Sequence, residues 1–423
     1  MINLSIGDGL LEKIYVVLII LSLLIAYICW TRSVLNVGAY LLSIYLFSFV
    51  GALFLPDNGA IFTFEAGSYL LLLLFFFVTP SLAIDSGRVW GVRLIDSTLF
   101  RCMAFVLIVS GWFSILYFLP VVFRLFLSGE SFVILRTDMV GGETYVDASI
   151  YYYLASFASQ FYPVTITLYF YSILFTNNGR AFNNLLLLSS TAYIFNVLAA
   201  VGRDGVVLWS MSFLFAFFLF KNFFTERHLK HFRRIAFLAC ALFLAVFVPI
   251  TISRFSILGG AEAVFLSLLS YSSQQLMYFN EIYNSGFTFP YEPSRIFPLI
   301  GYALGFDQEG GDFLEYNRAF YEAYGIDINV FKTFVGDFYV YLGSSVTFWV
   351  GLFFCISSLI ILRNNGIVTL EKLIFATLLC QVPLHGVFYY KLGYNVSNLY
   401  FLAVVTIAVL ISFSRLFSNR YIG

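Results

Sequence analysis

"TLFRCMAFVLIVSGWFSILYFLPVVFR", residues 98–124, is the kind of apolar run that decides the fold of this chain. No charged residue lies between Arg101 and Arg124. A helix needs about 20 apolar residues to cross the hydrocarbon core of a bilayer. This run is therefore long enough to cross a membrane as one helix.

The composition extends this interpretation to the whole chain. Hydrophobic residues make up 61% of the sequence and charged residues 11%, whereas soluble domains carry about a quarter charged residues. Mean hydropathy is +0.90. We therefore expect an all-α polytopic membrane protein and no nucleic-acid partner. All five cysteines lie inside apolar runs, so no disulfide and no cysteine metal site is expected.

Further runs of this kind recur along the sequence. The start, "MINLSIGDGLLEK", has two acids before its first base, which does not fit a cleavable signal peptide. We predict about eleven spans, since each needs about 20 apolar residues, at 11–30, 34–55, 65–84, 98–124, 150–175, 182–200, 205–224, 235–252, 340–361, 372–390 and 396–414.

Charge asymmetry orients the predicted spans. The stretch 221–234, "KNFFTERHLKHFRR", holds five Lys and Arg residues and one acid, so the positive-inside rule makes it a cytoplasmic loop. His228 and His231 are expected to be solvated there. Alternation of the spans then places the N-terminus outside and the C-terminus inside.

Two outer loops, 125–149 and 253–339, carry most of the polar residues outside the predicted spans. Residues 261–280 are apolar on one side and rich in Ser and Gln on the other. We predict an interfacial or re-entrant helix there, not a span. The whole chain, 1–423, is expected to form a single integral membrane domain whose large outer loop carries short helices.

Each outer loop contains an Arg followed, after four residues, by Gly-Gly: "RTDMVGG" begins at Arg136 and "RFSILGG" at Arg254. Arg presents a planar, permanently charged fork that suits phosphate. A Gly pair permits close backbone approach, and a following helix start offers free N–H groups. The pattern predicts a pyrophosphate site at Arg136 and Arg254. Arg that extends to lipid headgroups beside ordinary turns is the alternative.

Two more polar residues lie near the predicted outer face. Arg203 stands in "VGRDG", between two closely spaced spans, and is either a phosphate ligand or part of a solvated hairpin turn. His385 lies in the tenth predicted span, roughly 7 Å below its outer end. An ionisable side chain at that depth is a functional candidate, and His can act as a general base. A His bonded to backbone beside Pro383 is the alternative.

The segment 307–343 combines acids with aromatic residues. Carboxylates accept hydrogen bonds from sugar hydroxyls, and aromatic faces pack on sugar rings. The segment therefore predicts glycan binding, against the alternative of a solvated loop with aromatics at headgroup level. No spacing of His, Asp or Glu suggests a metal site. The candidate glycan-binding residues are Glu315, Tyr316, Asn317, Arg318 and Tyr339.

The stretch that follows the long outer loop, "TFVGDFYVYLG" at 333–343, resembles bacterial oligosaccharide repeat-unit polymerases, the Wzy-type O-antigen polymerases. The resemblance rests on six residues here and on the overall plan of spans and outer loops. These residues are Thr333, Phe334, Gly336, Asp337, Tyr339 and Gly343.

The resemblance implies a GT-C-like architecture and an enzyme of the bacterial inner membrane with its active site facing the periplasm. Such an enzyme joins oligosaccharide units carried on undecaprenyl pyrophosphate, and undecaprenyl pyrophosphate leaves. Membrane lipids and a chain-length regulator protein are the other partners it implies, and it implies no cofactor. By likeness to the related ligases, Arg203 and Arg254 would contact the pyrophosphate and His385 would activate the acceptor hydroxyl.

Alternatives remain at this point. Asp337 or Glu315 could replace His385 as the base. An O-antigen ligase is the nearest enzymatic alternative. A transporter or flippase of lipid-linked glycans would instead need intramembrane charges along a path, and few charges lie within the predicted spans.

Overall fold

The computed structural model of the chain describes residues 9–55, 61–85, 89, 91–128, 134–135, 149–255, 260–285, 291–305, 318, 320–322, 325, 328 and 331–418. Within its helices, the backbone alone is described at 239, 242–243, 245–255, 260–264 and 414–418.

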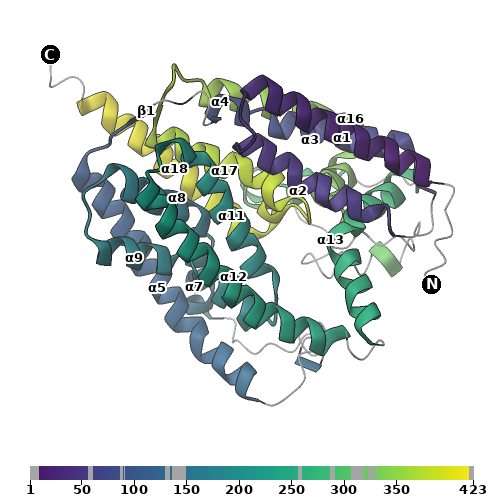
Figure 1. The fold of residues 1–423 in the computed structure, drawn as a ribbon, viewed down its shortest axis with the longest axis horizontal. Helices are drawn as coiled ribbons and strands as arrows, with labels where there is room; N and C mark the ends of the chain where they lie inside the picture. Colours follow the sequence, from purple (N-terminus) through teal and green to yellow (C-terminus); the bar gives the residue numbers. More distant parts are fainter. Residues whose placement is uncertain are drawn as a thin grey trace. The chain divides into compact units, whose positions relative to one another are not determined.

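Helices dominate the described part of the chain (Figure 1). Among the described residues, seven helices are long and apolar enough to cross a membrane: Leu10–Thr31, Phe64–Ile84, Ser97–Leu127, Arg180–Ala199, Asp204–Phe223, Thr333–Leu362 and Asn395–Phe413. Two apolar helices, Val37–Ala52 and Tyr162–Phe175, are shorter. The expected all-α membrane protein is confirmed at this level, and the number of eleven spans stays a prediction.

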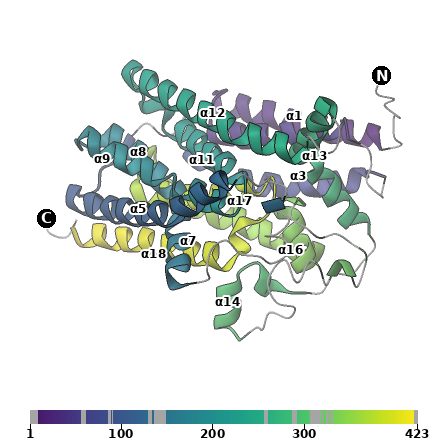
Figure 2. The same cartoon turned by 90° about the horizontal axis from the view of Figure 1, so that it is seen from below.

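The chain divides into two compact units, each assembled from separate segments. Unit 1 comprises Met1–Val89, Leu268–Gly366 and Leu379–Leu402. Its elements are α1 (Leu10–Thr31), α2 (Val37–Ala52), α3 (Phe64–Val78), α4 (Ser81–Ile84), most of α13 (Gly260–Asn284), η3 (Pro293–Arg295), α14 (Pro298–Ala303), α16 (Thr333–Leu362) and η4 (Lys391–Gly393). Within this unit α1 packs along α2 and α3 (Figures 1 and 2).

Unit 2 comprises Trp90–Ser267, Ile367–Leu378 and Ala403–Gly423. Its elements are β1 (Gly91–Arg93), α5 (Ser97–Leu127), α7 (Ile150–Ser159), α8 (Tyr162–Phe175), α9 (Arg180–Ser189), α10 (Ala192–Ala199), α11 (Asp204–Phe220), η1 (Lys221–Phe223), α12 (Glu226–Phe255) and β2 (Ile367–Thr369). The chain runs from one unit to the other within α17 (Leu370–His385) and α18 (Asn395–Ser418).

Polar side chains cap the ends of several apolar helices. The Asn36 side chain accepts a hydrogen bond of 2.7 Å from Ala39 N at the start of α2. Asp96 Oδ1 accepts bonds of 2.8 Å and 3.0 Å from the N–H groups of Thr98 and Leu99 in α5. Such caps satisfy N–H groups that a helix leaves without an internal partner. They fix where these apolar helices begin.

Two predicted spans are interrupted. The predicted span 150–175 is split into α7, which ends at Ser159, and α8, which begins at Tyr162 with Pro163 in its first turn. Proline has no N–H to continue a preceding helix, but it suits a helix start. The predicted span 182–200 consists of α9 and α10, which have only Ser190 and Thr191 between them and together form the span candidate Arg180–Ala199 named above.

The predicted helix at 261–280 is present as α13, Gly260–Asn284. Its polar side chains contact protein within unit 1: Ser48 Oγ donates to Gln275 Oε1 at 3.1 Å, and Thr63 N donates to Asn280 Oδ1 at 2.8 Å. Gln275 and Asn280 are both buried. The polar side of this part of the helix therefore contacts protein, and whether the helix is interfacial or re-entrant stays a prediction.

The basic stretch 221–234 is not the loop that the sequence predicted. η1 ends at Phe223, and α12 begins at Glu226, so most of the stretch is helical. The charged residues form the first turns of a helix whose later residues are apolar. A search for apolar runs finds only the apolar part of this helix. It does not find the preceding helical turns, because their residues are polar.

A short parallel ladder, which the all-α expectation did not include, pairs β1 with β2. Gly91 lies opposite Ile367, and Arg93 opposite Thr369. Both strands lie in unit 2. The ladder joins two loops that the predicted topology puts on the same side of the membrane.

Candidate functional site

Several candidate residues cannot be assessed in the structure. Arg136, Glu315, Tyr316 and Asn317 lie outside the described residues. Arg254 lies in the last turn of α12, but its side chain belongs to the stretch of which only the backbone is described. Their assignment as pyrophosphate-binding or glycan-binding residues stays a prediction.

Arg203 occupies a tight turn in unit 2. It is the residue before α11, and 6% of its surface is exposed. Gly202 N donates to Val197 O at 2.8 Å, and a Cβ on Gly202 would lie 2.5 Å from Val197 Cγ1. The turn thus packs directly on α10. Because Arg203 is buried, the alternative of a fully solvated hairpin turn does not describe it.

The motif at 333–343 forms a separate segment of α16. Gly343 has φ 73° and ψ 168°, a conformation that interrupts the helix and that residues with a side chain essentially do not adopt. Residues 333–342 therefore form a short helical segment ahead of the longer one. The predicted span 340–361 thus lies in a helix that begins at Thr333 and bends at Gly343.

This short segment is fixed to residues 382–391, and we call the two together the joint. Thr333 N donates to Phe388 O at 3.1 Å, and Phe334 N donates to Gly386 O at 2.8 Å. A Cβ on Gly386 would lie 2.7 Å from Phe334 Cδ1 and 2.1 Å from Val382 O. The first N–H groups of the segment are thus bound to protein carbonyls and are not open to a phosphate.

A buried ion pair stabilises the joint. Lys332 Nζ lies 3.0 Å from Asp337 Oδ1, and the two side chains are 0% and 5% exposed. Asp337 Oδ2 accepts a 2.7 Å bond from Tyr390 N, and Lys332 Nζ also donates to Ile328 O. Both carboxylate oxygens are therefore engaged. In this arrangement Asp337 links α16 to Tyr390, and its role as a base stays a prediction.

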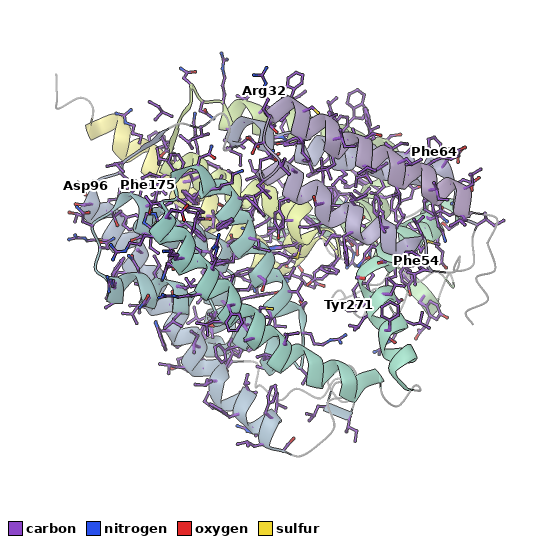
Figure 3. All side chains as sticks on the ribbon, in the orientation of Figure 1. Arg32, Phe54, Phe64, Asp96, Phe175 and Tyr271 are labelled. Atoms are coloured by element: carbon purple, nitrogen blue, oxygen red, sulfur yellow. The ribbon has the colours of Figure 1, made fainter. Side chains whose placement is uncertain are left out.

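His385 belongs to the second segment of the same joint. It ends α17, is 3% exposed, and directly precedes Gly386. Tyr45 Oη donates to Pro383 O at 2.7 Å, which anchors this end of α17 to α2. Tyr271 of α13 is labelled in Figure 3, and its ring lies 4.9 Å from that of Phe331 and 6.0 Å from that of Phe388 in the joint. Two residues with a predicted catalytic role, His385 and Asp337, thus lie on the two hydrogen-bonded segments of the joint, and both are buried.

Tyr339 belongs to an aromatic cluster on the next turn of the short segment. Its ring centroid lies 6.0 Å from that of Tyr69, 6.1 Å from that of Phe279 and 5.5 Å from that of Tyr283. Tyr69 Oη donates to Ser344 O at 2.6 Å, next to the bend. Tyr339, Tyr69 and Tyr283 are each partly exposed. Arg318, the other described candidate for glycan binding, is exposed.

Sequence reasoning missed four buried basic residues in the described part of unit 1, one of which is Lys13 of α1. Lys332, Lys391 and Arg295 are 0%, 9% and 8% exposed. Arg295 forms an ion pair with Glu292 of the preceding turn. Lys332 directly precedes the motif at 333–343, and Lys391 follows the predicted tenth span. From the sequence alone, each is expected to contact lipid headgroups at a membrane edge. The ion-pair partners of Lys332 and Arg295 lie within five residues in the sequence, but residue type and spacing alone do not show that these side chains are buried.

No group of three or more His, Cys, Asp or Glu side chains is placed to hold a metal ion in the part of the chain that the structure describes. No family model, no curated protein and no solved structure matches this chain.

Proposed function

We propose that this chain joins lipid-linked oligosaccharide repeat units into a polysaccharide at the outer face of the bacterial inner membrane. The observation that carries the proposal is the joint. The motif that resembles the Wzy-type polymerases folds as one compact element, and His385 lies directly beside it. A span count of eleven, a GT-C-like architecture and a periplasmic active site belong to this proposal.

Glycosyl transfer from a lipid pyrophosphate needs two kinds of assistance. Negative charge grows on the leaving pyrophosphate, and fixed cations in a water-poor site stabilise it. Among the described residues, Arg203 is the best candidate for such a cation, because it is buried. Arg136 and Arg254 are proposed for the same role. The acceptor hydroxyl must lose a proton, and a neutral His can take it.

Of the two described candidates for the base, we prefer His385, because both oxygens of Asp337 are engaged. During transfer, an acceptor oxygen of one unit attacks the anomeric carbon of the other. The bond from that carbon to the pyrophosphate oxygen breaks, and undecaprenyl pyrophosphate departs. The proton of the acceptor hydroxyl passes to the base. The partly exposed tyrosines around Tyr339 would pack against sugar rings.

The surface polysaccharide of a deletion strain, displayed on a gel, tests the function. Loss of a polymerase should leave products with a single repeat unit. Bare core with accumulating lipid-linked chains would instead identify a ligase, and single units trapped inside the cell would identify a flippase. Complementation by the unaltered chain should restore the ladder of long products.

Arg203→Lys tests the mechanism in the same strain. Lysine keeps the charge but loses the planar fork that binds phosphate at two points, so we expect a strong loss of long products, on the order of 100-fold. Arg124→Lys is the matched control, because Arg124 is exposed at the end of α5. A normal ladder from Arg203→Lys at normal protein level would refute the proposed contact.

A further inference from the structure

The first turns of α12 carry a one-sided stripe of positive charge. Arg227, Lys230, His231 and Arg234 follow one another at spacings of three, one and three residues, so they share one face of the helix. Arg227, Lys230 and Arg234 are exposed. Arg233, also exposed, follows Lys230 by three residues and so lies at the edge of the stripe.

The stripe is held in a fixed position by aromatic packing on the other side of the helix. Phe232 is 2% exposed. Its ring lies 4.7 Å from that of Phe170 in α8 and 4.8 Å from that of Phe224. On the charged face, His231 Nε2 lies 3.0 Å from Tyr169 Oη, also in α8. His231 is therefore tied to a neighbouring helix and is not merely solvated, as the sequence had suggested.

Positive charge from a second helix converges on the same place. Arg180, the first residue of α9, acts electrostatically on His231, as do Arg234 and His228 of α12. Burial and these cations together lower the pKa of His231 below its usual range. Glu226 is the one acid within 221–235. Among the described residues, the side chains of Arg180, Arg227, Lys230 and Arg234 form no ion pair with a carboxylate.

Like charges at these helical spacings repel one another, and Glu226, four residues before Lys230, is the one nearby acid in the sequence against these four basic residues. A bound phosphate-bearing anion would neutralise this positive charge. The stripe directly precedes the apolar part of α12, which is where basic clusters meet anionic lipid headgroups. We propose that Arg227, Lys230 and Arg234 of α12, together with Arg180 of α9, form a binding site for the phosphodiester headgroup of an anionic lipid. This site lies within unit 2 and is independent of the proposed polymerase activity.

The purified full chain in lipid nanodiscs provides the test. Nanodiscs would contain phosphatidylcholine alone or mixed with increasing fractions of phosphatidylglycerol, and bound anionic lipid would be counted after transfer to detergent by native mass spectrometry. We expect saturable retention of phosphatidylglycerol. Arg234→Gln should weaken it about fivefold, the factor for one basic residue near an anionic surface.

Arg124→Gln is the matched control, since it removes the same charge from an exposed residue at the end of another helix of unit 2, α5. It should change retention by less than about twofold, because it leaves the four proposed contacts in place. Equal effects of Arg124→Gln and Arg234→Gln would overturn the site, because general surface charge would then explain binding. Retention that is equal for both lipids would also overturn it. In a parallel arm, full displacement of the lipid by millimolar inorganic phosphate would refute a lipid headgroup and identify a soluble anion as the occupant.

Discussion

The buried ion pair of the joint gives the most direct prediction of how this fold is stabilised. Asp337→Asn removes the negative charge but keeps an oxygen that can accept from Tyr390 N, which now bonds Oδ2 at 2.7 Å. Lys332 would then remain 0% exposed without its carboxylate. Breaking a buried pair in this way costs about 3–5 kcal/mol, because an uncompensated charge stays buried. We expect Asp337→Asn to destabilise the protein by that amount.

The double variant Lys332→Met, Asp337→Asn separates the ion pair from the rest of the site. It removes both charges and keeps an acceptor for Tyr390 N. Because replacing a whole buried pair is often neutral, we expect the double variant to recover most of the lost stability. Relative to Asp337→Asn alone, the double variant should therefore regain about 2–4 kcal/mol.

Thermal unfolding of the purified full chain in one detergent measures these effects. For domains of about 200 residues, 1 kcal/mol shifts the midpoint by roughly 2–4 °C, so Asp337→Asn should lower it on the order of 10 °C. Asp96→Asn is the matched control. Asp96 is an exposed helix cap, and Asn caps about as well as Asp, so its midpoint should barely change.

Two outcomes would refute the reasoning. In the first, Asp337→Asn unfolds within about 2 °C of the unaltered protein. In the second, the double variant is no more stable than the single one. If Asp337→Asn is as stable as the unaltered protein but makes no polymer, Asp337 is the base and not a link between segments.

Two glycines of the joint give further predictions. Gly386→Ala would bring a Cβ to 2.7 Å from Phe334 Cδ1 and should cost about 1–3 kcal/mol by overpacking; an unchanged melting midpoint would contradict the close packing. Gly343→Ala meets no atom within 4 Å, so its cost of about 1–3 kcal/mol is conformational, at φ 73° and ψ 168°. Gly179→Ala is the control for both, since Gly179 has open space and φ −64°; equal losses at Gly179 and Gly343 would remove the conformational explanation.

Much of the fold could be predicted from local sequence. The apolar run at 98–124 became α5, Ser97–Leu127, because length and hydropathy alone decide whether a helix suits a bilayer. The split at 160–161 was missed although Pro163 is visible in the sequence. An apolar stretch without charged residues gives little sign of where one helix ends and another begins.

The candidate site was predicted only in part. The motif at 333–343 and His385 were recognised from their residue types, and the structure brings them together in the joint. The sequence assigned Asp337 to catalysis and overlooked Lys332, whose ammonium lies 3.0 Å from it. Residue type cannot show whether a carboxylate near a membrane edge faces substrate or a buried lysine, because a carboxylate can accept hydrogen bonds from either one.

The sequence by itself determined that this chain is an all-α membrane protein, since the cost of leaving backbone polar groups unpaired in hydrocarbon leaves few other choices for such runs. It also determined which residue types are available for charge and sugar contacts. Only the tertiary structure decided that Thr333 and Phe334 bond the carbonyls of Phe388 and Gly386, and that Arg180 of α9 acts electrostatically on His231 of α12. The physical reason is that such contacts join residues distant in the chain, whose approach depends on the packing of whole helices and not on any local pattern.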